Sequence, residues 1–206
     1  VNDPEYLPLA LMKPWTLPVF LVAAALAPIG LLFRFAVLTP LSLLSPRLRR
    51  LVVERYSGLQ INPHFRRPAP TGAFRRDWLL QEGACSLWAI ALLAMTVSGA
   101  IPWRAFLIVL AVAAGVMFLN QVRTMVAHLW ENEGEPMSVT AQYLDSVNVP
   151  PPGTLPALWA PVGLRYHALH HLLPGLPYHA LGEAHRRLVA ALAPDSVYRA
   201  TEHRSL

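Results

Sequence analysis

The chain has 206 residues, of which 54% are hydrophobic and only 14% are charged, and its mean hydropathy is +0.39. A typical soluble domain is about one quarter charged, so this composition excludes an ordinary soluble domain and predicts a membrane protein. The net charge of +5 comes from arginines that border apolar segments, without a nucleic-acid-binding motif. We therefore expect these arginines to contact anionic lipid headgroups, and we expect no nucleic-acid partner.

Three long stretches without charge each approach the roughly 20 residues that a membrane-spanning helix needs. They are Trp15 to Phe33, Gly83 to Trp103, and Ala105 to Val122. The second and third, separated by Arg104, predict a transmembrane helical hairpin. The first contains Pro18 and Pro28 and is followed by a second apolar run. We expect there a re-entrant or interfacial segment broken at the prolines, with a single crossing as the alternative.

The orientation follows from the segment between the first stretch and the hairpin. From Arg34 to Arg76 there are nine arginines against one acid, Glu54, which marks this segment as cytoplasmic under the positive-inside rule. Since the hairpin leaves that side and returns to it, the residues after Val122 are also expected to face the cytoplasm. The predicted fold is a single all-α, polytopic membrane domain over residues 1–206 with cytoplasmic helices.

The third apolar stretch ends in a polar segment. Thr124, His128 and Asn132 recur every four residues there, so they share one face of a helix. Polar groups at the end of a spanning helix are costly to bury without partners, which indicates a polar site or a water-filled cavity.

Three of the eight histidines fall within five residues, at His167, His170 and His171. In a helix, these offsets of i, i+3 and i+4 lie on one face. Neutral imidazole nitrogens suit iron, zinc or copper, so the run is interpreted as part of a metal site. The alternative is a polar, solvated helix end at which histidines cluster without binding metal. His128 becomes a candidate ligand because of this run. The segment Leu173–Pro177 is expected to end the helix, and an amphipathic helix is expected over Leu181–Leu192.

From about Asn120 to Leu188 the chain resembles the membrane fatty acid desaturases and their hydroxylase relatives, in particular bacterial members. The resemblance lies in the HxxHH box at His167, the helix end from Arg123 to His128, the stretch from Asp145 to Asn148, and the tail from Pro177 to Leu188. Before Asn120 it is only architectural.

The resemblance implies a non-haem site with two iron ions, held by eight or more histidines from several boxes, that uses O2 as co-substrate. Onto this chain it carries His128, His167, His170 and His171 as metal ligands. The other boxes, HxxxH and a first HxxHH, have no counterpart here and would precede Val1, where the chain starts with the acidic stretch Val1–Tyr6. The chain alone is therefore expected to bind metal weakly and to catalyse nothing.

Three polar residues are candidates for a supporting role around the ligands. Asp145 is expected either to accept a hydrogen bond from a ligand imidazole or to be a turn or cap residue, and the two are weighed equally. Thr124 and Asn148 are also predicted to lie beside the ligands.

The predicted function is that of the C-terminal half of an O2-dependent di-iron oxygenase that desaturates the acyl chains of lipids, in the bacterial inner membrane with the histidines facing the cytoplasm. An acyl-lipid hydroxylase of the same family is the alternative. An inactive metal-binding or scaffold protein is another, and a zinc hydrolase is disfavoured because the chain lacks HExxH. The expected partners are an acyl lipid and an electron donor such as ferredoxin or a cytochrome.

Overall fold

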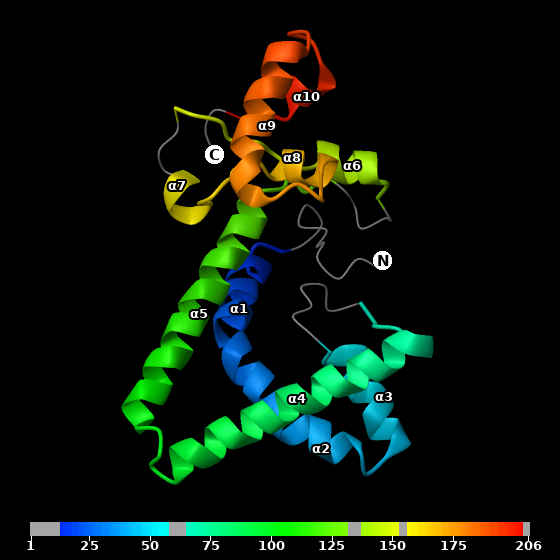
Figure 1. Ribbon diagram of the computed structural model, residues 1–206, viewed down its shortest axis with the longest axis vertical. Helices are drawn as coiled ribbons and strands as arrows, with labels where there is room; N and C mark the ends of the chain where they lie inside the picture. The colour runs from blue at the N-terminus through cyan, green and yellow to red at the C-terminus, as the bar shows by residue number, and fades with distance from the viewer. Residues whose placement is uncertain (1–12, 58–64, 132–136, 153–155, 204–206) are drawn as a thin grey trace. The chain divides into compact units, whose positions relative to one another are not determined.

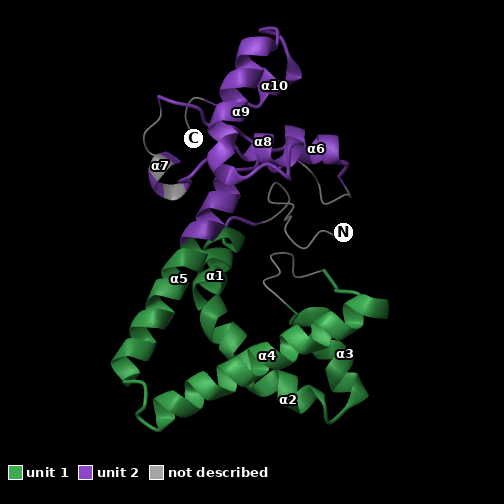
Figure 2. Cartoon of the chain, in the orientation of Figure 1, with its two compact units in different colours: residues 1–6, 15–118 green, residues 7–14, 119–206 purple. Residues whose placement is uncertain are grey.

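The computed structural model describes residues 13–57, 65–131, 137–152 and 156–203, and this part of the chain is helical, with isolated β-bridges in place of strands (Figure 1). The contacts of these residues form two compact units (Figure 2). Unit 1 contains residues 15–118, and unit 2 contains residues 13–14 together with the described residues after 118. The acidic start Val1–Tyr6 and Asn132 lie outside the described residues. The assignment of one domain to the whole chain stays a prediction.

Unit 1 begins with a long helical run made of α1 (Thr16–Phe33), the π-helical turn η2 (Arg34–Leu38) and α2 (Thr39–Ser42). The expected break at the prolines is not there, because Pro18 lies in the first turn and the helix continues through Pro28. Pro40 would press its ring on the carbonyl of the residue four positions earlier in a regular helix. The wider π-helical turn lies over that position and lets the run continue.

Helix α3 (Pro46–Arg55) follows a short corner and is too short to span a membrane. It starts with extended Ser45 and a proline in its first turn, an arrangement that suits a helix N-terminus. Val52 and Val53 are buried, whereas Arg47 and Arg50 are exposed, so the helix is amphipathic. An amphipathic helix of this kind fits the surface of a membrane.

Helices α4 (Gly72–Val97) and α5 (Trp103–Val126) flank the turn 98–102, as the predicted hairpin requires. Gly99 takes a φ of +80° in this turn, a left-handed conformation that glycine adopts without a steric penalty. Together with the run Thr16–Ser42, α4 and α5 are the three described helices that are long and apolar enough to cross a membrane, judged by length and composition. The all-α, polytopic fold class is thereby confirmed.

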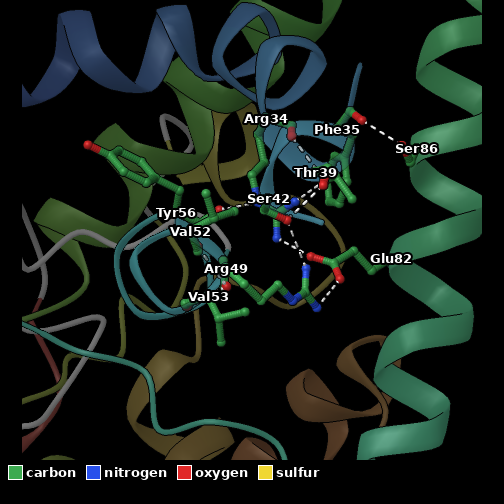
Figure 3. Close-up of polar contacts among 11 residues, drawn as sticks. Arg34, Phe35, Thr39, Ser42, Arg49, Val52, Val53, Tyr56, Glu82 and Ser86 are labelled. Atoms are coloured by element: carbon green, nitrogen blue, oxygen red, sulfur yellow. Dashed lines mark hydrogen bonds and ion pairs between the residues drawn. The ribbon is translucent and has the colours of Figure 1, made fainter. Parts of the chain in front are cut away.

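A buried group of charged side chains joins these segments in unit 1 (Figure 3). Glu82 on α4 accepts a hydrogen bond from Arg34 of η2 at 2.5 Å and another from Arg49 of α3. In addition, the Ser86 hydroxyl donates to the Phe35 carbonyl at 2.7 Å. These bonds hold α4 against the π-helical turn and α3.

Unit 2 is organised around the extended strip from Ser146 to Val149, which follows α6 (Val139–Leu144) and the turn at Asp145. The Val147 amide donates to the Ala127 carbonyl, the Ala168 amide donates to the Val147 carbonyl, and the Asn148 amide donates to the Thr201 carbonyl. The strip is therefore bonded to the end of α5, to the histidine helix and to the C-terminal segment. Its Ser146 and Asn148 are 0% exposed.

The histidine helix α8 (His167–Leu172) packs on this strip, and α7 (Pro156–Trp159) precedes it. Helices α9 (Tyr178–Ala191) and α10 (Val197–Ala200) complete the unit. The core contains buried residues from α6, α8, α9 and α10 and from the position just before α8: Tyr143, Tyr166, Ala168, Leu169, Leu181 and Tyr198. The expected end of the histidine helix before Pro174 and the expected amphipathic helix after it are both present.

Candidate metal centre

Three histidines from two segments converge in unit 2. The Nε2 atom of His167 lies 3.0 Å from Nε2 of His128 and 3.1 Å from Nε2 of His171. One ring nitrogen from each of the three lies within 4.8 Å of the other two, so the group has the spacing of a metal site. Among the described residues, this is the one group of histidine, cysteine or acidic side chains with that spacing.

His128 is placed by the backbone that follows α5. The Leu129 amide donates to the Asp145 carbonyl at 2.7 Å, which joins this segment to the start of the extended strip. Trp130 then takes a φ of +60°, and its indole Nε1 donates to the Met125 carbonyl at 2.7 Å. A left-handed conformation is unusual for tryptophan, so this bond and the burial of the ring fix the turn that presents His128.

The other two histidines depend on how α8 is held. The Asn148 side chain accepts a hydrogen bond from the Leu169 amide at 3.0 Å, so it satisfies one of the unpaired N–H groups in the first turn of this helix. Its own side-chain amide donates to the Thr201 hydroxyl at 3.0 Å. A residue from the extended strip thus caps the histidine helix from outside its own sequence.

His170 has a different surrounding from the other three predicted ligands. Its Nε2 lies 3.4 Å from the hydroxyl of Tyr178, and the two rings lie 4.9 Å apart between centroids at a tilt of 36°. Of the three histidines expected to share one helix face, His167 and His171, at i and i+4, lie in the cluster. The third imidazole lies beside the cluster, with its Nδ1 buried and without a hydrogen-bond partner.

Tyr178 reaches His170 because of a close approach at Gly163. Gly163 has a φ of +88°, and a Cβ atom added there would lie 1.9 Å from the Tyr178 carbonyl oxygen. Only glycine allows the turn before α8 to pass so close to the start of α9.

The predicted supporting residues divide into two groups. An oxygen of Asp145 lies 3.5 Å from His128 Nδ1, and Ser146 Oγ lies 3.3 Å from the same nitrogen. Asp145 also accepts a hydrogen bond from the Glu131 amide and caps the end of α6, as a turn or cap residue would. The expected hydrogen bond from a ligand imidazole to Asp145 stays a prediction. Thr124, by contrast, donates to the carbonyl of Asn120 on its own helix.

The electrostatics of the site favour a neutral imidazole at His167 and at the neighbouring His170. Burial lowers the pKa of His167 to about 2, and the charges of His128, His171 and Arg123 act in the same direction. Burial also lowers the pKa of His170. A neutral imidazole offers its lone pair to a metal, and three such nitrogens suit iron, zinc or copper. The residues present therefore fit a metal ion.

Three contacts around the cluster were not expected from the sequence. They are made by Trp130, Ser146 and Tyr178, which lie against His128 or His170. Ser146 lies within the stretch that resembles the bacterial enzymes, and Tyr178 lies in the resembling tail. No local pattern singled out these side chains, because each of their contacts joins segments that are distant along the chain or separated by a turn.

The fold and the cluster define an all-helical protein with three candidate membrane spans and a three-histidine candidate metal site. The chain belongs to the fatty acid desaturase family, because the family model "Fatty acid desaturase" matches residues 2–202. It is 54% identical over 201 residues to a ceramide hydroxylase of Caulobacter vibrioides (strain NA1000 / CB15N), an alignment that covers 97% of this chain and 57% of that protein. The chain thus spans somewhat more than half the length of this relative. No solved structure matches it.

Proposed function

We propose that this chain is the metal-binding C-terminal part of an O2-dependent membrane oxygenase that hydroxylates an acyl lipid of the ceramide type. The three converging imidazoles carry this proposal, because a donor set of this kind suits the iron that oxygenases of this family use. The similarity to a ceramide hydroxylase favours an alcohol product over an alkene product. Desaturation of the acyl chain is the outcome against which the proposal is tested.

His128, His167 and His171 would hold one metal ion, and His170 would supply a ligand from beside the cluster to a second ion. A pair of iron ions, when bound, supplies the activation of O2 and the removal of hydrogen from a methylene group. The Ser146 hydroxyl donates its proton to the Gln142 carbonyl, so its oxygen is left to accept a hydrogen bond from His128 Nδ1 at 3.3 Å. The Asp145 carboxylate lies 3.5 Å from the same nitrogen, and both groups favour the tautomer that leaves the Nε2 lone pair for the cluster.

The remaining partners follow from the chemistry. Incorporation of one oxygen atom from O2 into a C–H bond requires two electrons from outside, so a ferredoxin or a cytochrome is proposed as the donor. We also propose that the histidines face the cytoplasm of a bacterial inner membrane, where such donors are available. The arginine-rich segment between Arg34 and Arg76 supports this orientation.

The test is product analysis in a ceramide-producing host that lacks the endogenous gene. The complete gene containing this chain is expressed there, and the lipids are analysed by mass spectrometry. The proposal expects ceramides that have gained one oxygen atom, with none formed by the His167→Ala variant. His179→Ala is the matched control, because His179 is an exposed histidine on α9, and it should leave the product unchanged. Lipids that have instead lost two hydrogen atoms would overturn the hydroxylase assignment in favour of a desaturase.

A further inference from the structure

The buried charges of unit 1 do not balance. Arg34, Arg49 and Glu82 form one connected group, and Glu82 uses one carboxylate oxygen for each guanidinium. Arginine is always protonated in proteins, and a carboxylate between two guanidinium groups stays ionised. The group therefore carries one excess positive charge.

Arg34 is committed to this group. Its side chain is 5% exposed, and it donates from Nε to the Tyr56 carbonyl at 2.6 Å and to the Thr39 hydroxyl as well as to Glu82. Burying a charge is costly unless it is paired, so the excess charge calls for a further anion. Among the described residues, Glu82 is the one acidic side chain that forms an ion pair with either arginine.

Arg49 is the member of the group that a ligand can reach, because 23% of its side chain is exposed. Its hydrogen bonds to Ser42 and Glu82 orient its guanidinium group. A partly exposed guanidinium held in this way has further N–H groups beyond these two bonds, and such groups pair well with phosphate oxygens.

The surroundings of Arg49 are those of a membrane surface. Leu43 and Leu44, at the corner that leads into α3, are 74% and 82% exposed. Glu82 directly precedes a charge-free stretch, and Arg49 lies in the amphipathic helix that follows the run Thr16–Ser42, so both lie where an apolar segment meets polar sequence. A lipid phosphate lies at that depth in a bilayer.

From this charge imbalance we infer a phosphate-binding site at Arg49, completed by the headgroup of an anionic phospholipid. Glu82 and Ser42 orient the guanidinium, and the lipid phosphate supplies the negative charge that the group lacks. The inference concerns unit 1 and does not depend on the metal site or on the proposed reaction.

The test uses the intact chain, purified in a neutral detergent and stripped of lipid. Binding of phosphatidylglycerol, phosphatidylcholine and inorganic phosphate is measured by native mass spectrometry and by the shift in melting temperature. The wild-type chain should bind phosphatidylglycerol more tightly than phosphatidylcholine. Arg49→Gln should weaken the binding of phosphatidylglycerol about tenfold or more, because a charge-assisted pair of hydrogen bonds is lost.

The matched control is Arg50→Gln, which removes an exposed arginine from the same helix and should change the affinity less than about threefold. Equal losses in the two variants would overturn the inference, because they would show a diffuse basic surface. Equal affinity of the wild-type chain for both lipids would overturn it as well.

Two further measurements keep the inference testable if Arg49→Gln does not fold. Arg49→Lys keeps the charge but not the planar donor pair, and it should bind phosphatidylglycerol more weakly than the wild type does. The wild-type chain is also titrated with inorganic phosphate. Stabilisation by the free ion as strong as by the lipid would confirm a phosphate site but refute the lipid source.

Discussion

Replacement of Asn148 by alanine is the sharpest test of how the histidine helix is held. The Asn148 side chain is 0% exposed and accepts a hydrogen bond from the Leu169 amide. Its removal leaves that amide buried in the first turn of α8 without a partner. The Thr201 hydroxyl also loses a contact, but it keeps its own bond to the Tyr198 carbonyl at 2.7 Å. One group is therefore orphaned, at a cost of about 2 kcal/mol.

This cost is measurable as hydrogen exchange at the Leu169 amide. A local destabilisation of about 2 kcal/mol corresponds to roughly 30-fold faster exchange, provided that the amide exchanges by local opening. Because His167 and His171 lie on the same helix, the affinity of the chain for Co2+ or Zn2+ should fall in the same variant. Mass spectrometry of exchanged peptides and metal titration measure the two effects.

The matched variant is Thr201→Val, which removes the other partner of the Asn148 side chain but keeps the acceptor for Leu169. Its effect on exchange of the Leu169 amide should stay below about threefold. If Asn148→Ala left this exchange unchanged, or if both variants accelerated it equally, the argument that Asn148 caps α8 would be refuted.

Three further predictions concern unit 2. Asp145→Asn removes the carboxylate beside His128 Nδ1 and should weaken metal binding by about 10- to 100-fold in a titration. The control Asp195→Asn changes an exposed position and should leave the metal affinity unchanged. Equal affinities of the two variants would exclude a role for Asp145. Gly163→Ala should destabilise the chain by more than about 2 kcal/mol in thermal unfolding, because the new Cβ would meet the Tyr178 carbonyl. Gly175→Ala places its Cβ in open space and should change the stability little. Similar melting temperatures of the two variants would contradict the close approach at Gly163. Burial lowers the pKa of His185, so below about pH 6.5 this residue binds more protons in the unfolded chain than in the folded chain. The unfolding free energy should therefore fall on acidification, by at most about 1.4 kcal/mol per pH unit for this residue. His185→Phe should flatten this dependence in melting curves from pH 7.5 to 5, and an unchanged slope would show that His185 does not titrate on unfolding.

The sequence predicted those parts of the fold that depend on local patterns. The charge-free stretches correspond to helices α1, α4 and α5, and the turn signals Pro174 and Gly175 separate α8 from α9. These features depend on length, apolar content and backbone preference, which are all readable over a short window. Continuation of the first helix through Pro28 was not predicted, because Pro28 is buried in the fold and tertiary packing of this kind leaves no local pattern.

The candidate site could be predicted only in part from the sequence, for a different reason. The offsets i, i+3 and i+4 suggested that His170 acts together with His167 and His171. The close approach at Gly163, however, brings Tyr178 against His170. The pairing of Glu82 with two arginines and the bond from Asn148 to Thr201 join residues far apart in the chain. Such contacts depend on tertiary structure, and no periodic pattern in the sequence predicts them.

The extended strip also determines when the candidate site can form. Asn148 receives a hydrogen bond from the His203 amide and donates one to the Thr201 carbonyl, so the segment that caps the histidine helix is itself held by residues more than fifty positions later. While the chain is being synthesised, His128 and His167 are available well before these later residues. The strip cannot complete its bonds until residue 203 has left the ribosome, so the histidines are synthesised before the contacts that hold them in place can form.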